Sequence, residues 1–365
     1  MRIGILTLHY ARNFGAVLQA YASLRFLRSL GYDAEMVDYR NAVIEEGYRP
    51  WRWDASRARQ EGAGYVLKYV PTALSRMKRD AAFSGFVRKF LLGGQDCRPL
   101  NISELKGYDA LLIGSDQVWS PSLTGGFDPV YTGAFAPGES KVAWAASAKR
   151  EDLEAMDPRE IGRMLSAFHA VSVREESLCH LLQPYCSKRI ALVMDPTLLV
   201  GRPVWEEIAD AYPVRETSPY VLAYPMLDDG TVIKMARELA AAKGMKLRII
   251  SKNADWKVTS ERIQWAGPGA FLSWVRGARY VVTSSFHGTA FSLIFGKPFL
   301  SVSASPGGRI ESLLQRLKMT DRISIGSLDN IDQEIDTKYI EESLSLFRKE
   351  AESFLKDALP WTTGN

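Results

Sequence analysis

Short apolar runs alternate with amphipathic segments along most of the chain, and this alternation predicts an α/β fold. Residues 2–8 form an apolar run typical of a buried strand, and residues 34–38 form a second one. Between them, residues 16–30 carry apolar side chains at helical spacing and end before Gly31, a residue suited to a helix C-cap. A strand, a helix and another strand make one βαβ unit, so we expect a parallel sheet.

The same series continues to about residue 200 and then starts again. Further strands are predicted in the first part at 109–113, 141–146, 170–174 and 190–194, with a helix at 151–167. In the second part we expect strands at 219–224, 247–250, 279–283 and 299–302, and helices at 230–242, 268–276 and 309–317. The two series predict two Rossmann-like parallel-sheet domains, 1–200 and 201–337, that face each other across a cleft. An amphipathic helix within 338–365 should pack back across them.

Residues 40–100 interrupt the first series and predict a helical insertion in the N-terminal domain. Trp51 and Trp53 stand among many arginines there, and only 83–92 has clear helical spacing. A basic and aromatic segment of this kind binds anionic sugars or lipids in some proteins and is a solvated surface in others. Loose attachment to a membrane through residues 50–90 therefore stays open.

Composition narrows the class of protein. A hydrophobic fraction of 46% and a charged fraction of 24% are typical of a soluble globular chain. The net charge of +4 gives no reason to expect nucleic-acid binding. Three cysteines without C-x-x-C spacing indicate reduced thiols and a cytoplasmic protein. No apolar run reaches the 18 residues of a membrane span, and the opening strand does not resemble a signal peptide.

Several kinds of site are not indicated. The first strand–helix turn holds a single glycine, Gly15, so a dinucleotide fingerprint is absent. H-E-x-x-H and a cysteine cluster are also absent, and we expect neither a protein-held metal nor a cofactor. Walker A and Gly-x-Ser-x-Gly motifs are missing from the turns where they would act.

Polar side chains follow two of the predicted strands. In 279–299, a strand is followed by Ser284, Ser285 and His287 at the start of a helix, where free N–H groups favour anions. His287 is placed to hold a phosphate or to move a proton, although it could instead only cap the helix. Ser115, Asp116 and Gln117 follow strand 109–113, and Asp116 or Gln117 could orient an acceptor hydroxyl. The alternative for Asp116 is a turn-capping role.

An arginine ends another predicted strand, and a second arginine opens a late helix. Arg174 ends strand 170–174, and its guanidinium suits a carboxylate or phosphate. The alternative is a salt bridge with Glu175 or Glu176. Arg309 opens the helix at 309–317.

Five motifs occur in the order in which a known family carries them. They are Asn13-Phe-Gly-Ala-Val-Leu-Gln-Ala-Tyr-Ala22, Gly114-Ser-Asp-Gln-Val-Trp119, Ser172-Val-Arg-Glu-Glu-Ser177, Met194-Asp-Pro-Thr-Leu198 and Thr283-Ser-Ser-Phe-His-Gly-Thr289. Over roughly residues 3–305, the chain resembles the polysaccharide pyruvyl transferases. The resemblance implies a GT-B-like fold and transfer of a pyruvyl group from phosphoenolpyruvate to two sugar hydroxyls. The product would be a cyclic ketal on a cell-surface glycan or its lipid-linked precursor.

The resemblance also implies roles for individual residues. Arg174 matches the arginine that grips phosphoenolpyruvate, and His287 matches the family histidine, which would act as general acid. Many members carry an arginine where this chain has Ser285, so Arg309 or Lys252 would supply the second cation. Ser284 and Ser285 would complete the donor pocket, and Asp116 would orient the acceptor hydroxyl or take its proton. Asn13 and Ser115 would line the cleft.

Two other functions remain open at this point. One is a GT-B-type glycosyltransferase that uses a nucleotide sugar, which the domain plan permits. The other is a non-catalytic glycan-assembly protein, because this chain has Ser285 where many family members carry an arginine. The acceptor sugar and the oligomeric state have no readable signal in the sequence.

Overall fold

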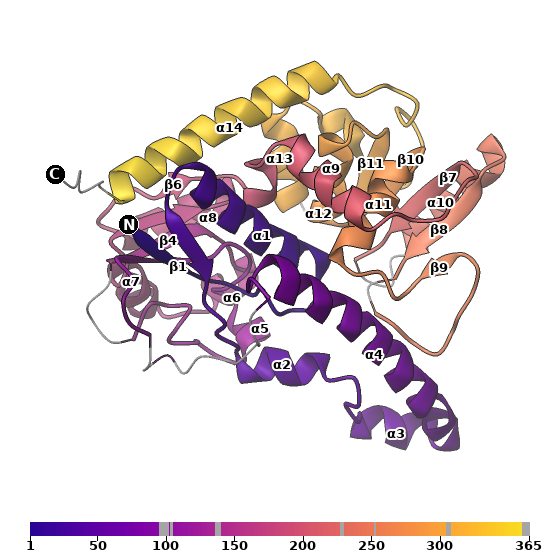
Figure 1. The fold of residues 1–365 in the computed structure, drawn as a ribbon, viewed down its shortest axis with the longest axis horizontal. Coiled ribbons are helices and arrows are strands. Elements are labelled where there is room, and N and C mark those ends of the chain that lie inside the picture. The colour runs from indigo at the N-terminus through magenta and orange to yellow at the C-terminus, as the bar shows by residue number, and fades with distance from the viewer. Residues whose placement is uncertain are drawn as a thin grey trace. The chain divides into compact units, whose positions relative to one another are not determined.

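The computed structural model describes residues 1–94, 102, 105–135, 140–226, 230–251, 253–303 and 308–359 (Figure 1). Contacts between residues divide the chain into two units. The first unit contains residues 1–47, 87–200 and 343–365, and the second contains 48–86 and 201–342. Each unit is described separately below.

A parallel sheet forms the centre of the first unit. Within the described residues its six strands run in the order β2-β1-β3-β4-β5-β6. The strands are β1 (Arg2–Leu6), β2 (Asp33–Met36), β3 (Ala110–Ile113), β4 (Ser140–Ala146), β5 (Ala170–Val173) and β6 (Ala191–Leu192). The helices are α1 (Phe14–Ser29), α2 (Ala42–Tyr48), α5 (Pro121–Thr124), α6 (Arg150–Glu154), α7 (Pro158–Ser166), α8 (Glu176–Leu182), η2 (Gln183–Tyr185) and η3 (Pro196–Leu198). The predicted parallel α/β sheet is therefore confirmed for this half.

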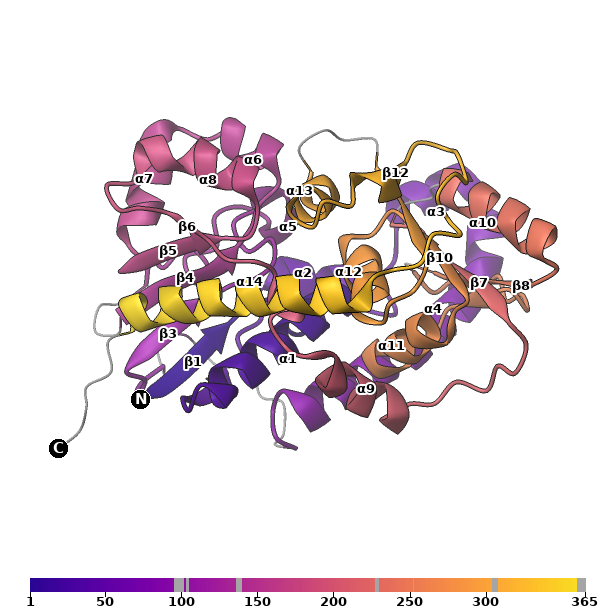
Figure 2. The same cartoon turned by 90° about the horizontal axis from the view of Figure 1, so that it is seen from above.

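Apolar side chains on both faces of this sheet make the core of the first unit. All four residues of β3 are fully buried, as expected for a strand covered on both faces. The last helix of the chain is α14 (Thr337–Ala358), drawn in yellow in Figure 2. It contributes to this core, because Phe354 stacks on Trp144 of β4 with ring centres 6.3 Å apart. Arg348 of the same helix donates a hydrogen bond to the carbonyl oxygen of Leu199.

The second unit repeats the plan. Its six strands in the described residues are also parallel, in the order β12-β11-β10-β7-β8-β9. They are β7 (Tyr220–Tyr224), β8 (Lys246–Ile250), β9 (Arg262–Ile263), β10 (Tyr280–Thr283), β11 (Phe299–Val302) and β12 (Ile323–Ser324). The helices are α3 (Ala55–Glu61), α4 (Ala63–Phe90), α9 (Arg202–Ala211), α10 (Gly230–Lys243), α11 (Pro268–Gly277), α12 (Phe286–Ile294), α13 (Arg309–Arg316) and η4 (Thr320–Arg322). The prediction of a second parallel-sheet domain is confirmed.

Two predicted helices differ from those observed. The single helix expected at 151–167 is two helices, α6 and α7, because Asp157 and Pro158 start a new helix. Pro158 occupies the first turn of α7, where its missing N–H costs nothing. The helix expected at 83–92 begins twenty residues earlier, and α4 continues through Pro71.

The insertion also belongs to a different unit from the one expected. Residues 48–86 group with the second unit rather than with the N-terminal domain. Buried Arg79 of α4 donates hydrogen bonds to the carbonyl oxygens of Ser251 and Gln264. Gly267 packs against Ala82 so closely that a Cβ atom there would lie 2.9 Å from the carbonyl oxygen of Ala82. These contacts attach the segment to the sheet of the second unit.

Among the helices of the described residues, none has the length and apolar character needed to span a bilayer.

Candidate functional site

The turn after β3 brings Ser115 and Asp116 to the carboxyl edge of the first sheet. Gly114 approaches β4 so closely that a Cβ atom would collide with the carbonyl oxygen of Trp144. Asp116 has a φ of 74°, and Ala145 of β4, which precedes the residue paired with Asp116, has a φ of 43°. Residues other than glycine rarely adopt this left-handed region, and such strain is concentrated at functional sites. The Gly114–Ser115 peptide bond is cis.

Arg174 is the centre of a buried ion cluster in the first unit. Its side chain is 1% exposed, and its three nitrogens contact three different carboxylates. Nη1 lies 2.6 Å from Asp195 Oδ2, Nη2 lies 3.2 Å from Asp116 Oδ1, and Nε lies 3.2 Å from Glu175 Oε1. Burial opposes the charge on Arg174, but these carboxylates outweigh it and raise the pKa of the guanidinium.

The contacts of this cluster can be compared with the structural alternatives for Arg174 and Asp116. The salt bridge with Glu175, the structural alternative for Arg174, is formed. The carboxylate of Asp116 pairs with Arg174, and the N-cap of the next helix, α5, is Ser120. Asp195, in the Met194-Asp-Pro-Thr-Leu198 motif, was expected either at a hinge or in the cleft, and its ion pair with Arg174 was not foreseen.

Hydroxyl groups hold two of the carboxylates in place. Ser147 Oγ donates to Glu175 Oε1 at 2.6 Å. Thr197 donates to Asp195 Oδ1 from both its backbone nitrogen and its hydroxyl group. Asp116 is less enclosed, with 13% of its side chain exposed.

A short chain of buried hydrogen bonds supports the same turn from behind. Gln19 Nε2 on α1 donates to Thr7 Oγ1 at 2.8 Å, and Thr7 Oγ1 donates to the carbonyl oxygen of Ser115 at 2.9 Å. Ser115 Oγ donates to the carbonyl oxygen of Ala145. The backbone that carries Asp116 is therefore fixed by the first helix as well as by β4.

The other two residues predicted in this half lie outside the ion cluster. Asn13 caps α1, where its side-chain oxygen accepts a hydrogen bond from the nitrogen of Ala16. Gln117 is half-buried in the turn, and its carbonyl oxygen accepts a bond from Ser120.

A second cluster of titratable side chains lies in the first unit, just after the ends of β1 and β2. His9 is fully buried, with Nε2 3.0 Å from Asp38 Oδ1, and Arg40 pairs with the same carboxylate. Desolvation raises the pKa of Asp38, but the hydrogen bonds from His9 and Arg40 dominate and lower it to about 2. No motif in the sequence pointed to this group.

In the second unit, the turn after β10 gathers the predicted hydroxyl groups and the histidine. Ser285 is the N-cap of α12, and its Oγ accepts a hydrogen bond from the nitrogen of Gly288. The capping alternative for His287 is therefore wrong, because His287 is the second residue of the helix. Its ring is 6% exposed and packs edge-on against Phe286, with centres 5.1 Å apart.

Neighbouring groups complete this edge of the second sheet. Ser284 Oγ accepts a hydrogen bond from the nitrogen of Met226. Burial raises the pKa of Tyr224 to about 12, despite a hydrogen bond with Ser285 that lowers it. Tyr224 therefore stays protonated near neutral pH beside the serine.

One of the two candidate cations lies at this edge. The guanidinium of Arg309, the first residue of α13, lies over the ring of Phe286 at 5.9 Å. Phe286 precedes His287, so Arg309, the two serines and the histidine share one end of the second unit. Lys252 lies outside the described residues.

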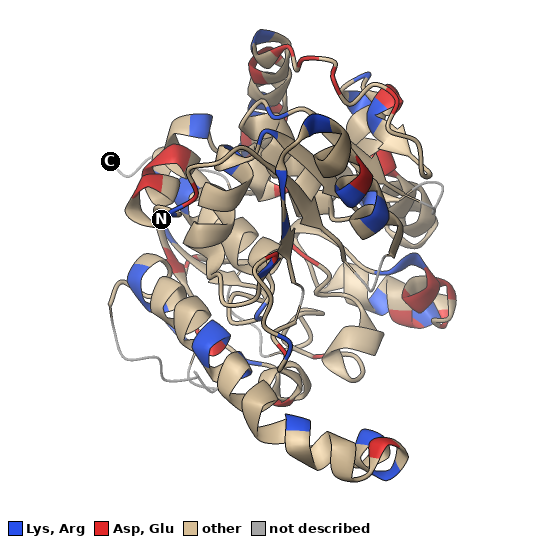
Figure 3. Cartoon of the chain, turned by 90° about the vertical axis from the view of Figure 1, so that its right-hand side faces the viewer, with Lys and Arg blue, Asp and Glu red and all other residues tan. Residues whose placement is uncertain are grey.

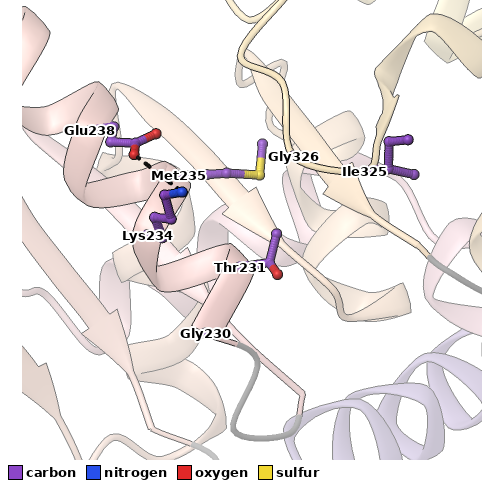
Figure 4. A pocket seen from close by; sticks show the side chains of 7 residues that line it. All are labelled: Gly230, Thr231, Lys234, Met235, Glu238, Ile325 and Gly326. Carbon is purple, nitrogen blue, oxygen red and sulfur yellow. Dashed lines mark ion pairs between the residues drawn. The ribbon is translucent and has the colours of Figure 1, made fainter.

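Two further features concern ligands. In the parts of the chain that are described, no group of three or more His, Cys, Asp or Glu side chains is arranged to hold a metal ion. A hollow beside α10 contains none of the predicted site residues (Figure 4). It is lined by Gly230, Thr231, Lys234, Met235, Glu238, Ile325 and Gly326.

Comparison with known proteins gives one family and several structures. A family model described as polysaccharide pyruvyl transferase matches residues 13–306. No curated protein matches the chain in sequence. Matching solved structures include the glycosyltransferase SnogD from Streptomyces nogalater, with 12% identity, coverage of 98% of this chain and 97% of that chain, and a TM-score of 0.42. They also include the UDP-GlcNAc 2-epimerase from Neisseria meningitidis bound to UDP-GlcNAc, with 11% identity, coverage of 98% and 94%, and a TM-score of 0.48.

Proposed function

Because this chain belongs to the polysaccharide pyruvyl transferase family and is therefore a transferase, we propose that its donor is phosphoenolpyruvate. The acceptor is a pair of hydroxyls on a cell-surface glycan or on its lipid-linked precursor, and the product is a pyruvate ketal. The observation that supports this best is the turn after β10, where two serines, a buried histidine and Arg309 meet at a helix N-terminus. Such an end favours a phosphate group.

The second unit would bind and activate the donor. The phosphate and the carboxylate of the donor are contacted by Ser284, Ser285 and Arg309. Arg309 supplies the positive charge that many family members carry at the position of Ser285. His287 protonates the methylene carbon of phosphoenolpyruvate, which becomes a methyl group. The central carbon then carries positive charge and is open to attack by a hydroxyl oxygen.

The first unit would orient the acceptor. One sugar hydroxyl attacks the central carbon and gives its proton to Asp116. The bond between that carbon and the phosphate oxygen breaks, and phosphate leaves with the bond electrons. The second hydroxyl then attacks the same carbon and closes the ketal ring. Its proton returns to His287, and the proton held by Asp116 leaves with the phosphate as hydrogen phosphate.

Arg174 then acts as a positioning residue rather than as a donor clamp. A donor phosphate would have to displace three carboxylates from a guanidinium that is 1% exposed. Arg174→Lys keeps the charge but loses the three-way geometry. We expect it to lower kcat and to leave KM for phosphoenolpyruvate within about twofold. A large rise in that KM with unchanged kcat would restore the donor-clamp interpretation.

The test of His287 does not require the acceptor to be known. The protein is incubated with phosphoenolpyruvate in D2O, and NMR follows loss of the methylene protons. His287→Gln should slow this exchange by about 10²–10⁴-fold, the usual contribution of a general acid. His169→Gln, at an exposed histidine, is the matched control and should exchange like wild type. Equal rates for wild type and His287→Gln would remove His287 from this role.

The reaction itself is tested by phosphate release with a panel of sugars and lipid-linked oligosaccharides. Phosphate release that requires both phosphoenolpyruvate and an acceptor supports the proposal. Turnover only with nucleotide sugars would instead indicate a glycosyltransferase. We place the reaction in the cytoplasm, since phosphoenolpyruvate is a metabolite of that compartment and Cys179 and Cys186 are free thiols.

A further inference from the structure

Helix α4 exposes an apolar face where a surface helix normally carries charge. The exposed positions between residues 63 and 77 are all apolar: Ala63, Val66, Leu67, Val70, Pro71, Leu74 and Met77. We call these seven residues the α4 face. Leu67 is 78% exposed, and Val70 and Leu74 are 50% exposed. Figure 3 shows α4, the helix that runs down to the foot of the view, in tan over most of its length.

Helix α4 is apolar on its exposed side although it also buries apolar side chains, Tyr65, Ala73 and Phe83 among them. The buried side of α4 carries Ser75 and the Arg79 guanidinium, which bonds to backbone carbonyls of the second unit. Residues 67, 70, 74 and 77 follow one another at steps of three and four, so they form one continuous stripe. A contiguous exposed apolar stripe of this kind marks an interaction surface.

Half-exposed tryptophans flank the α4 face on both sides. Among the described residues the exposed tryptophans are Trp51, Trp53, Trp256 and Trp265. Trp51 and Trp53 pack against Tyr69 of α4, whereas Trp265 donates a hydrogen bond to Ser75. Positions 69 and 75 differ by about 240° around the helix, which places them on opposite sides of the stripe. Indole rings of this kind prefer the boundary between lipid headgroups and acyl chains.

The charge of this segment points to an anionic partner. Residues 48–86 contain eight of the 46 Lys and Arg residues of the chain and three of its 42 Asp and Glu residues. The rest of the chain therefore holds 38 basic and 39 acidic residues, so the net positive charge comes from this segment. Lys78 and Lys68 lie over the rings of Trp265 and Trp256, at 4.4 and 5.6 Å.

From these observations we infer that the α4 face docks on an anionic lipid bilayer. Apolar side chains enter the boundary of the acyl chains, the tryptophans lie at headgroup level, and the flanking basic residues contact the headgroups. No described helix can span a bilayer, so this surface would lie on the membrane rather than cross it. The inference uses the surface alone and does not depend on the proposed reaction.

The test is flotation of the full chain with vesicles of equal phosphatidylglycerol and phosphatidylcholine, compared with pure phosphatidylcholine. Wild type should float with the anionic vesicles and much less with the neutral ones. Leu67→Glu combined with Leu74→Glu removes two apolar contacts and adds two negative charges, so we expect at least about 100-fold weaker partitioning. Both leucines are exposed, and glutamate has a similar helix propensity, so thermal unfolding should stay near that of wild type.

The matched control replaces two exposed apolar residues elsewhere. Ile325→Glu combined with Leu346→Glu adds the same charge, and it should weaken flotation much less. Tryptophan emission should shift to the blue on vesicle binding, and Trp51→Phe combined with Trp53→Phe should reduce this shift. Absence of flotation, or equal loss in both double variants, would overturn the inference. A dimer that Leu67→Glu converts to a monomer, without vesicle binding, would show that a second copy covers the face instead.

Discussion

Removal of the Arg174 guanidinium would leave three buried carboxylates with no cation between them. We predict that Arg174→Met lowers the free energy of unfolding strongly. At an effective dielectric constant of about 20, each ion pair about 3 Å apart is worth about 5 kcal/mol. Desolvation of the charges and repulsion between the carboxylates offset most of this sum. Loss of one partner from a buried pair costs about 3–5 kcal/mol, and the three partners place this case near the upper end.

The loss of unfolding free energy in Arg174→Met should also depend on pH in a definite direction. Without Arg174, the folded state should raise the pKa of the orphaned carboxyls above the unfolded value of about 4. The destabilisation is then complete at pH 7.5 and shrinks as the pH falls, because the folded variant takes up protons first. The difference in stability between wild type and variant should therefore narrow between pH 7.5 and pH 5.

Urea unfolding at several pH values measures both effects. Arg163→Met is the control, since Arg163 is 77% exposed and lies 3.8 Å from Glu160, and it should cost less than about 1 kcal/mol. A loss below 1 kcal/mol for Arg174→Met would refute the reasoning. So would a loss that does not change between pH 7.5 and pH 5.

Two further predictions concern other contacts. Desolvation raises the pKa of Asp38, whose ordinary value is 3.8, but His9 and Arg40 outweigh it and hold the pKa near 2. This stabilisation is present above pH 4 and is lost as the pH falls through 2, so the unfolding free energies of wild type and Asp38→Asn should converge across that window. Gly288→Ala would press a methyl group against Thr283 Oγ1 and should cost about 1–3 kcal/mol in denaturant unfolding; an unchanged midpoint would show that α12 can shift freely.

Local patterns predicted the strands and helices of the two sheets well. The apolar run at 109–113 predicted β3 because a strand buried on both faces needs no polar alternation. Pro158 was read as part of one long helix, although a proline suits the first turn of a new helix at least as well. The first two thirds of α4 escape prediction because apolar residues lie on both its buried and its exposed sides, so its sequence lacks the one-sided pattern of a helix packed on a core.

Long-range contacts were the part that the sequence could not supply. Arg174 could be recognised as a cation at a strand end, but its ion pair with Asp195, 21 positions away, depends on how the two strand ends are placed in the sheet. Arg79 holds residues 48–86 to the second unit through bonds to Ser251 and Gln264, more than 170 positions away. A search along the chain for a domain boundary has no signal for such a pairing.

The interleaved order of the two units has a consequence for synthesis on the ribosome. The first unit begins at the N-terminus but lacks Phe354, which stacks on Trp144, until residues 343–359 have emerged. Arg79 likewise waits for Ser251 and Gln264, so the polypeptide made first spends most of translation without its partners. Nascent chains arrested near residue 200 should therefore be sensitive to protease, and truncation there should yield no independently stable fragment.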